Sequence, residues 1–295
     1  MRLTIPEEEI MQPGHLACQG CGATLAIRFV LKALGRKTVM SIPACCCTVI
    51  DGPFPYSAYG VPIWHTAFET AASAAAGIKA GLEMLGDRET TVLAWAGDGG
   101  TFDIGIQALS GAAERGDDIL YVCYDNEAYM NTGIQRSSAT PRGAWTTTTP
   151  VRHPKDRPKK DIIAIMAAHR IPYAATASVG YPEDLIKKVK KAKASKGTKF
   201  LHIIAPCPTG WRSRPDDTIK LARLVVETNV FPLYEVENGE VWQMTKKSKG
   251  TPVTEYLKLQ GRFKHLKEED VNEIQNKVDR EYEKLLKKCS IDSKQ

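Results

Sequence analysis

The sequence contains no apolar run of 18 or more residues that is free of charge, so it predicts no membrane-spanning helix. Its first segment, MRLTIPEEEIMQPGH, is acidic and lacks the apolar core of a secretory signal peptide. Internal repeats are absent, and Thr146–Thr149 is the single low-complexity tract. With 43% hydrophobic and 25% charged residues over 295 positions, we expect a globular cytoplasmic protein.

Nucleic-acid binding is disfavoured although the net charge is +6. Much of the excess lies in Arg152–Lys160 and in the tail after Lys246, and neither stretch is interleaved with aromatic residues. Acidic residues also dilute the tail. The pattern indicates a solvated face or a docking surface for an acidic protein.

Strand-length apolar runs alternate with helical patterns along most of the chain. We predict strands at Thr38–Ile42, Thr91–Ala96, Ile119–Tyr124, Tyr173–Val179 and Phe200–Ala205, with helices at Thr66–Leu85, Ile104–Arg115, Asp161–His169 and Pro182–Ala194. This alternation predicts an α/β fold with a doubly wound, mostly parallel sheet. Ligands of such folds bind beyond the carboxyl ends of the strands.

Two regions depart from this alternation. The stretch Asp125–Lys160 is a long loop inside a domain, which is typical of a functional segment. Within it, residues 146–160 are expected to cover a site or to contact a partner. After residue 210 we predict a helix at Asp216–Glu227, a hairpin around Asn238-Gly239 and a charged terminal helix at Lys264–Lys288. We therefore divide the chain into a ligand-binding domain, 1–210, and an extension for subunit packing, 211–295.

The stretch LAWAGDGGTFDIG places a carboxylate between glycines at the end of a predicted strand. Glycines let the backbone approach a phosphate, whereas Asp98 would repel a diphosphate unless a divalent cation lay between them. Mg²⁺ is bound in this way, through carboxylate oxygens and substrate phosphates. Asn126 ends the next strand, so its side-chain oxygen and the carbonyl of Ala128 are the expected further ligands.

Eight cysteines in a chain with this expected location favour metal ligation over disulfides. They are Cys18, Cys21, Cys45, Cys46, Cys47, Cys123, Cys207 and Cys289. The Cys18-Gln-Gly-Cys21 pair alone is compatible with zinc, an iron–sulfur cluster or a redox disulfide. Cys123 lies in a predicted strand and is expected to pack in the core.

Four segments in order carry a resemblance to a known family. CQGCGATLA, VPIWHTAFETAASAAAGI, GDGGTFDIG and YDNEAYMNTGIQRSSATP resemble the β subunit of 2-oxoacid:ferredoxin oxidoreductases of the pyruvate synthase type, of which oxalate oxidoreductase is a close relative. The resemblance covers about residues 14–211. It implies the thiamine-diphosphate-binding fold for the first domain, with thiamine diphosphate, Mg²⁺ and a [4Fe–4S] cluster as cofactors.

The resemblance also implies roles for individual residues. Asp98, Asn126 and Ala128 would bind Mg²⁺, and Asn131 would lie near the reactive carbon of thiamine as a catalytic residue. The implied cofactor-binding residues are Gly97, Asp98, Gly99, Gly100, Asn126, Ala128, Tyr129, Met130, Asn131 and Cys46. The implied cluster ligands are Cys18, Cys21, Cys46 and Cys207.

Three assignments stay open at this point. In extended chain, ligation by Cys46 would turn Cys45 and Cys47 away into packing, and the assignment could be shifted by one residue. His65 and Glu69 are spaced to share one face of a helix, and His65 is a candidate contact to substrate, cofactor or coenzyme A. His15 is undecided in the same way.

The implied reaction is oxidative decarboxylation of a small 2-oxoacid, pyruvate to acetyl-CoA and CO₂ in the first instance, with electrons passed to ferredoxin. Oxalate, 2-oxoglutarate, 2-oxoisovalerate and indolepyruvate are alternative substrates. The sequence offers no glutamate that we assign to thiamine activation and no ferredoxin-type C-x₂-C-x₂-C-x₃-C-P run. We therefore expect an α subunit to supply that glutamate, γ- and δ-type subunits to complete the enzyme, and the chain alone to be inactive.

Two other function classes are compatible with parts of the pattern. A non-redox thiamine-dependent decarboxylase or synthase would leave the four cysteines unexplained. A zinc-stabilised nucleic-acid-binding module would explain the CxxC pair and the basic charge but not the segment from Gly97 to Asn131. Metal content distinguishes the three.

Overall fold

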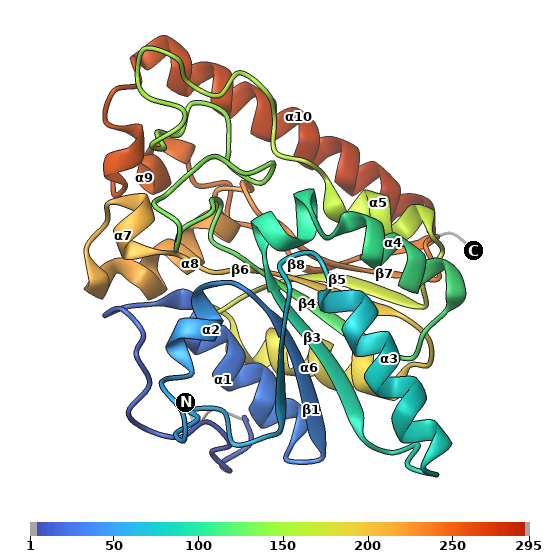
Figure 1. Ribbon diagram of the computed structural model, residues 1–295. Helices are drawn as coiled ribbons and strands as arrows, with labels where there is room; N and C mark the ends of the chain where they lie inside the picture. The colour runs from blue at the N-terminus through green and yellow to red at the C-terminus, as the bar shows by residue number, and fades with distance from the viewer. Residues whose placement is uncertain (1–4, 293–295) are drawn as a thin grey trace.

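Eight strands form one sheet in the computed structural model, which describes residues 5–292 (Figure 1). Their order is β2-β1-β3-β4-β6-β5-β7-β8, and the first six are parallel. The parallel strands are β1 (Thr38–Pro43), β2 (Ile63–Thr66), β3 (Thr91–Gly97), β4 (Leu120–Asp125), β5 (Tyr173–Ser178) and β6 (Lys199–Ile204). The antiparallel strands are β7 (Leu233–Glu237) and β8 (Val241–Lys246).

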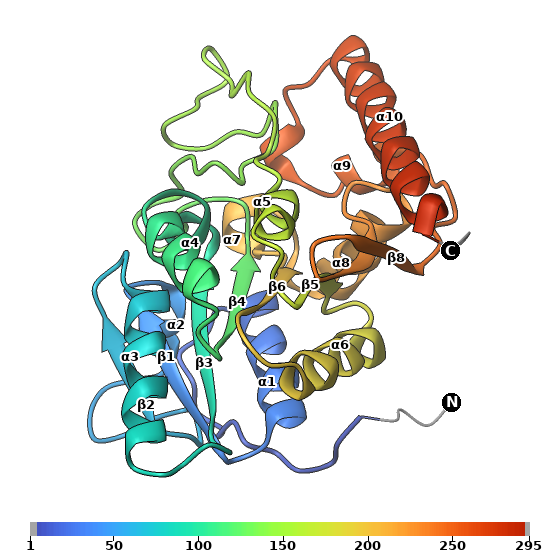
Figure 2. The same cartoon turned by 90° about the vertical axis from the view of Figure 1, so that its right-hand side faces the viewer.

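Helices cover both faces of this sheet, as Figure 2 shows for α3 and α4 on one side and α1 and α6 on the other. The longer helices are α1 (Gly22–Leu34), α3 (Ala71–Met84), α4 (Ile106–Arg115), α5 (Ile162–Ala168), α6 (Pro182–Ala194), α8 (Thr218–Glu227) and α10 (Glu268–Asp292). The short ones are α2 (Cys46–Ile50), α7 (Pro208–Trp211), α9 (Val253–Leu257), and the single turns η1 (Gly99–Asp103), η2 (Pro215–Asp217) and η3 (Gly261–Phe263). The predicted α/β, doubly wound, mostly parallel fold is confirmed.

Burial on both faces explains why the central strands are continuous apolar runs. Along β3, Leu93 and Trp95 pack in the cluster with α1 and α6, whereas Val92 and Ala94 pack in the cluster with α3 and α4. All four side chains are at most 1% exposed. A strand buried on two faces has no polar alternation, which is the pattern that parallel sheets require.

The predicted helix over Thr66–Leu85 begins too early. Residues Ile63–Thr66 form the edge strand β2, which pairs with β1 in the register Ile42↔His65, and α3 starts only at Ala71. Branched and aromatic residues favour such a strand, and the pairing partner lies more than 20 positions away in the sequence. His65 and Glu69 therefore do not share a helix face, and that prediction is wrong.

The extension continues the same sheet. β7 pairs with β5, and the three-residue turn before β8 carries Asn238 and Gly239 at φ of 53° and 72°. Asn and Gly are the residues that adopt positive φ most readily, so the predicted hairpin is confirmed. The division at residue 210 stays a prediction. No helix in the described part of the chain is long and apolar enough to span a membrane.

The arrow of β4 in Figure 2 points to the edge of the sheet where the long loops gather. The segments that follow β3, β4 and β6 all leave from this edge, since the three strands are parallel neighbours. Residues 126–160 are irregular, as predicted. This edge is where the chemistry predicted from the sequence has to lie.

Candidate cofactor site

Three oxygen donors converge at the carboxyl ends of β3 and β4. Asp98 and Asn126, which are 1% and 5% exposed, follow these strands directly. The side-chain oxygen of Asn126 faces only acceptors; rotating the amide by 180° places its nitrogen 2.9 Å from Oδ1 of Asp98 and 2.9 Å from the carbonyl oxygen of Ala128. Without a cation the rotated amide satisfies both acceptors. With the oxygen inward, the three groups form a set of hard donors that fits Mg²⁺.

Asp98 is a buried carboxylate without a cationic partner. Burial raises its pKa well above the usual range, and the nearby charge of Asp125 raises it further, although Ser137 and the charge of Lys159 act in the opposite direction. Ser137 Oγ donates a 2.5 Å hydrogen bond to Oδ2. No Lys, Arg or His side chain within residues 5–292 forms an ion pair with Asp98. The group is therefore suited to a cation that comes from outside the chain.

Asp125, at the end of β4, is equally buried but is neutralised by the protein. Lys159 Nζ forms an ion pair with it, and His202 Nε2 lies 2.7 Å from its Oδ2. Burial would raise the pKa of Asp125, but the charge of Lys159 and the bond to His202 lower it to about 2. The backbone N–H of Glu127 donates a 2.9 Å hydrogen bond to Oδ1 of Asp125, so Asp125 also shapes the turn after Asn126.

Glu127 and Trp211 anchor the same turn to distant parts of the chain. Glu127 has a φ of 68°, and its carboxylate accepts 2.9 Å and 2.6 Å bonds from Lys159 Nζ and Arg262 Nη2. Trp211 Nε1 donates 2.8 Å to the carbonyl of Asn126, and the Arg262 guanidinium lies 4.2 Å from the Trp211 ring centroid. The backbone of Asn126 is thus fixed from both sides.

The glycines after β3 make room for an aromatic ring. A Cβ at Gly99 would lie 2.2 Å from Cε1 of Tyr129, so the ring packs directly on this backbone. Tyr129 OH donates 2.8 Å to Asp103 Oδ2, at the end of the η1 turn. A Cβ at Gly97 or Gly100 would instead meet the side chain of Tyr124 at 3.2 Å or of Phe68 at 3.3 Å.

Met130 and Asn131 lead from the oxygen site toward the cysteines. The Met130 sulfur lies 2.1 Å from where a Cβ of Gly210 would be, so its thioether fills the space beside Cys207. Gly210 N–H donates 3.4 Å to Cys207 Sγ. Asn131 is exposed.

Backbone-to-backbone packing joins the CxxC turn to the segment that carries Cys207. Gly22 N–H donates 3.0 Å to the carbonyl of Pro206, and a Cβ on Gly22 would lie 2.8 Å from that residue. Cys21 caps α1, and its N–H donates 3.2 Å to the carbonyl of Cys18. The glycines of CQGCG therefore permit the close approach of two loops that are far apart in the sequence.

Two of the candidate cluster thiols, Cys46 and Cys207, have a raised pKa. Burial raises the pKa of Cys46 to about 12, and the charges of Cys45, Cys207 and Cys21 add to that effect. Burial likewise raises the pKa of Cys207 to about 11, together with the charges of Cys21 and Cys18. In residues 5–292, however, no group of three or more His, Cys, Asp or Glu side chains has the arrangement of a metal site.

The three consecutive cysteines do not form extended chain. Cys46 and Cys47 begin the helix α2, so the alternation argument for their directions is wrong, although Cys47 is fully buried as expected. Trp95 Nε1 donates 3.0 Å to Cys47 Sγ. Cys123 is also fully buried, in β4, as the core position predicted for it requires.

The two histidines singled out from the sequence lie on other segments. His65 is partly exposed on β2, and its Nε2 is 3.6 Å from Asp51 Oδ2. His15 accepts a 3.4 Å bond from Ala17 N–H through Nδ1.

The basic segment Arg152–Lys160 is not simply a solvated face. Lys155 is 4% exposed and donates 3.1 Å to the carbonyl of Ser138, while Lys159 reaches Asp125 and Glu127. The loop therefore closes over the turn after β4. Sequence reasoning missed Asp125, Glu127 and Lys159, although acidic residues beside Asn126 and a lysine-rich stretch in the same loop were available as a signal.

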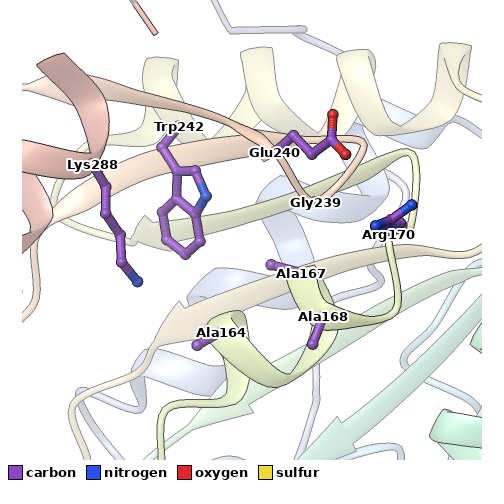
Figure 3. A pocket seen from close by; sticks show the side chains of 8 residues that line it. All are labelled: Ala164, Ala167, Ala168, Arg170, Gly239, Glu240, Trp242 and Lys288. Atoms are coloured by element: carbon purple, nitrogen blue, oxygen red, sulfur yellow. The ribbon is translucent and has the colours of Figure 1, made fainter. Parts of the chain in front are cut away.

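A cavity of about 410 Å³ lies elsewhere, between α5, the β7–β8 hairpin and α10 (Figure 3). Lys288 runs alongside Trp242, with its Nζ 4.4 Å from the ring centroid, and Arg170 lies near Gly239 on the other side. None of the residues that line it belongs to the oxygen or thiol groups described above.

Comparison with known proteins agrees with the geometry. The family described as "Thiamine pyrophosphate enzyme, C-terminal TPP binding domain" matches residues 46–203. The ketoisovalerate oxidoreductase subunit VorB of Pyrococcus abyssi is 56% identical, over 98% of this chain and 96% of the relative. The pyruvate synthase subunit PorB of Methanocaldococcus jannaschii is 52% identical, over 94% of this chain and 96% of the relative.

A solved structure shares the fold. It is the 2-oxoglutarate:ferredoxin oxidoreductase from Magnetococcus marinus with 2-oxoglutarate, coenzyme A and succinyl-CoA bound, which aligns with 76% of this chain and 81% of its own, at a TM-score of 0.59 and 22% identity. Together with the family match over more than half of the chain and the full-length relatives, these findings identify the chain as a member of the thiamine-diphosphate-dependent 2-oxoacid:ferredoxin oxidoreductase family, on the β-subunit branch.

Proposed function

We propose that this chain holds thiamine diphosphate, Mg²⁺ and one [4Fe–4S] cluster in an enzyme that oxidatively decarboxylates a small 2-oxoacid and passes the electrons to ferredoxin. The observation that carries the proposal is the convergence of the Asp98 carboxylate, the Asn126 amide and the Ala128 carbonyl within a thiamine-diphosphate-binding domain. Coenzyme A is the proposed acyl acceptor.

Each of the three donors has a distinct role. Asp98 supplies the negative charge that balances Mg²⁺, and Ser137 keeps its second oxygen fixed. Asn126 and Ala128 complete the set with neutral oxygens. Their backbone is held in place by the hydrogen bond from Trp211 to the carbonyl of Asn126 and by the one from Arg262 to the carboxylate of Glu127. A site held this rigidly orients the diphosphate without reorganisation.

Thiamine diphosphate, when bound, supplies the nucleophilic carbon and the electron sink for decarboxylation. Gly97, Gly99 and Gly100 are the proposed diphosphate-binding backbone, although aromatic side chains fill the space beside their α-carbons. Tyr129 and Met130 line the path toward the thiols, and Asn131 presents a free amide that can donate a hydrogen bond to the substrate carboxylate. His65 is the further proposed contact to substrate or coenzyme A.

The proposed cluster ligands are Cys18, Cys21, Cys46 and Cys207. Four thiolates are the donor set of a [4Fe–4S] cluster. Burial, and to a smaller degree the neighbouring thiols, raises the pKa values of Cys46 and Cys207, so iron would favour their thiolate forms. The charge of Asp98 is among the smaller causes of the raised pKa of Cys46, which supports a cluster site near the cofactor site. Short separation is what electron transfer between the two requires.

Partner subunits belong to the proposal. An α subunit supplies the glutamate that activates thiamine, and γ- and δ-type subunits provide further electron carriers. Residues 211–295 are the proposed packing surface.

Pyruvate and 2-oxoisovalerate are the two substrates to compare. Relatives named for ketoisovalerate are 54–56% identical to this chain, and relatives named for pyruvate are 46–52% identical. Since both groups align over most of the chain, the β subunit does not decide between them by overall similarity. Ratios of kcat/KM for the two acids in the purified complex decide the substrate.

Cofactor binding tests the oxygen site directly. Calorimetric titration of the purified complex with thiamine diphosphate and Mg²⁺ is expected to give saturable binding. Asp98→Asn should weaken this binding at least about 100-fold, because loss of even an outer-shell partner lowers metal affinity about 10- to 100-fold. Asp156→Asn, at a side chain 82% exposed, is the matched control and should bind normally. Equal binding by Asp98→Asn and the control would exclude the proposed role of Asp98.

Metal analysis tests the thiol site. Anaerobically purified protein is expected to contain about four irons and about four acid-labile sulfides per chain, with an EPR signal after dithionite reduction. Cys207→Ser should lose that iron, whereas Cys123→Ser, in the core, should keep it. Zinc in place of iron would remove the redox part of the proposal.

A further inference from the structure

A second cavity, of about 80 Å³, lies at the opposite edge of the sheet from the cofactor site. Thr91 and Lys199, the first residues of β3 and β6, belong to its lining, as does Leu120 at the start of β4. These are the amino ends of the same strands whose carboxyl ends carry Asp98 and Asn126. The cavity therefore lies a full strand length from the proposed chemistry.

The charge of this cavity is strongly one-sided. Its cationic lining residues are Lys79, Arg88, Lys193, Lys196 and Lys199, and its acidic ones are Glu89 and Asp118. Glu89 is engaged by Lys37, at 2.6 Å. Asp118 forms ion pairs with three ammonium groups, those of Lys79, Lys196 and Lys199.

Lys79 is the group that this arrangement leaves without a hydrogen-bond acceptor. Its side chain is 6% exposed, and its Nζ lies 3.7 Å from Asp118 and 3.6 Å from Glu83, beyond hydrogen-bond distance. Within the described residues, its Nζ forms these two long ion pairs and no hydrogen bond. The ammonium is therefore paired with two carboxylates but makes no hydrogen bond to either, so its N–H donors remain available to an anion.

Lys199 holds the one good contact to the shared carboxylate. It is 5% exposed and lies 2.5 Å from Asp118 Oδ1, while Lys196 at the rim lies 3.3 Å from Oδ2. Burial lowers the pKa of Lys199, and the charges of Lys196 and Lys79 lower it further despite the opposing effect of Asp118. A second anion is what would balance the group.

We propose that this cavity binds a phosphate group, with the Lys79 ammonium as its central donor and Lys199 and Lys196 beside it. A tetrahedral oxyanion fits a volume of about 80 Å³ and offers several acceptors to converging ammonium groups. The group could be free phosphate or a phosphomonoester, and the test below separates the two. The site is independent of the proposed function, because none of its residues belongs to the oxygen or thiol groups.

The test is a calorimetric titration of the purified complex with inorganic phosphate at constant ionic strength, after saturation with thiamine diphosphate and Mg²⁺. Saturation keeps phosphate out of the diphosphate site. We expect saturable binding of one phosphate per chain. AMP in a parallel titration would bind more tightly if the site takes a phosphomonoester, and no more tightly if it takes free phosphate. If neither phosphate nor AMP shows saturable binding, the proposal is overturned, and water is the partner of the Lys79 ammonium.

Matched lysine variants locate the binding. Lys79→Met is expected to raise the dissociation constant for phosphate at least about tenfold, because a hydrogen bond to a charged group is lost. Lys190→Met, on the exposed face of α6, removes the same charge outside the cavity and should leave phosphate binding unchanged. Phosphate binding by Lys79→Met equal to that of the wild type would contradict the proposal.

Thermal unfolding separates this role from a purely structural one. Without phosphate, Lys79→Met should be at least as stable as the wild type, since the ammonium makes no close contact. If Lys79 served mainly to hold Asp118, the variant would be less stable and its response to phosphate would persist. If Lys79→Met fails to fold, Lys196→Met provides the test: its side chain is 82% exposed, and we expect phosphate binding weakened about two- to fivefold.

Discussion

Two carboxylates at neighbouring strand ends have the same burial and opposite electrostatics. Asp98 after β3 is 1% exposed and Asp125 at the end of β4 is 0% exposed. Burial and the charge of Asp125 raise the pKa of Asp98, whereas Lys159 and His202 overcome burial and lower the pKa of Asp125 to about 2. The difference is the presence of a cationic partner from the chain itself.

This comparison separates a structural carboxylate from one prepared for a ligand. Removing charge from water is expensive, and Asp125 is compensated within the fold by its ion pair with Lys159. Asp98 has a hydroxyl and an amide beside it and feels the charge of Lys159 without forming an ion pair to it. A fold that keeps an uncompensated carboxylate at a strand end is prepared for a cation.

The largest effect is expected from Lys159→Met. This change leaves the buried carboxylates of Asp125 and Glu127 without their shared ammonium. Loss of one partner of a buried pair destabilises a protein by about 3–5 kcal/mol. Denaturant unfolding at pH 7 measures the loss. Arg157→Met lies two positions earlier on the exposed part of the loop and should change stability by less than about 0.5 kcal/mol.

Arg262→Met is expected to have the next largest effect. Glu127 would lose the 2.6 Å bond from Arg262 but keep Lys159, so the loss should be smaller, about 1.5–3 kcal/mol. Because Arg262 belongs to the extension, the change also loosens its contact with Trp211 and hence with Asn126. Affinity for thiamine diphosphate and Mg²⁺ should therefore fall together with stability. A loss of stability with unchanged cofactor affinity would show that the turn after β4 is held without Arg262.

The sequence was sufficient for the strand-end residues of this contrast. Asp98 and Asn126 each lie two positions after the end of an apolar run. Since the carboxyl ends of adjacent parallel strands meet at one edge, local pattern and topology together predict their approach. The need for glycines beside Asp98 was also predictable from the sequence, although the group closest to Gly99 is the ring of Tyr129.

The compensating cations could not be predicted. Lys159 and Arg262 lie 32 and 135 positions from Glu127, and no local pattern signals such pairs. The edge strand β2 was missed for the same reason, since it depends on pairing with β1 and is followed by an alanine-rich helix that dominates the local pattern. Local propensity determines elements with a strong period, and long-range pairing determines the rest.

Replacing each carboxylate by its amide tests the contrast directly. In cofactor-free protein, Asp98→Asn should leave stability unchanged or raise it by up to about 1 kcal/mol, because an uncompensated buried carboxylate is replaced by a neutral group of similar shape. Asp125→Asn should lose stability, because Lys159 is then left with Glu127 alone. Thermal unfolding with and without Mg²⁺ and thiamine diphosphate provides the measurement. Equal destabilisation by both variants would mean that Asp98 is already compensated within the chain.

The smallest effect on stability is expected from a comparison of two buried lysines in one loop. Lys159 and Lys155 differ as Asp125 and Asp98 do, since only one member of each pair has oppositely charged partners. Lys159 faces two carboxylates, and their charges raise the pKa of Lys159 despite its burial. Lys155 instead donates hydrogen bonds to backbone carbonyls. Burial, together with the charges of Arg136 and Lys159, lowers the pKa of Lys155 to about 8. Between pH 8 and about 10.5 the unfolded chain binds more protons at Lys155 than the folded chain, so this group makes stability rise with pH across that interval. Lys155→Met should flatten the profile of unfolding free energy against pH in this interval, whereas Lys190→Met should not.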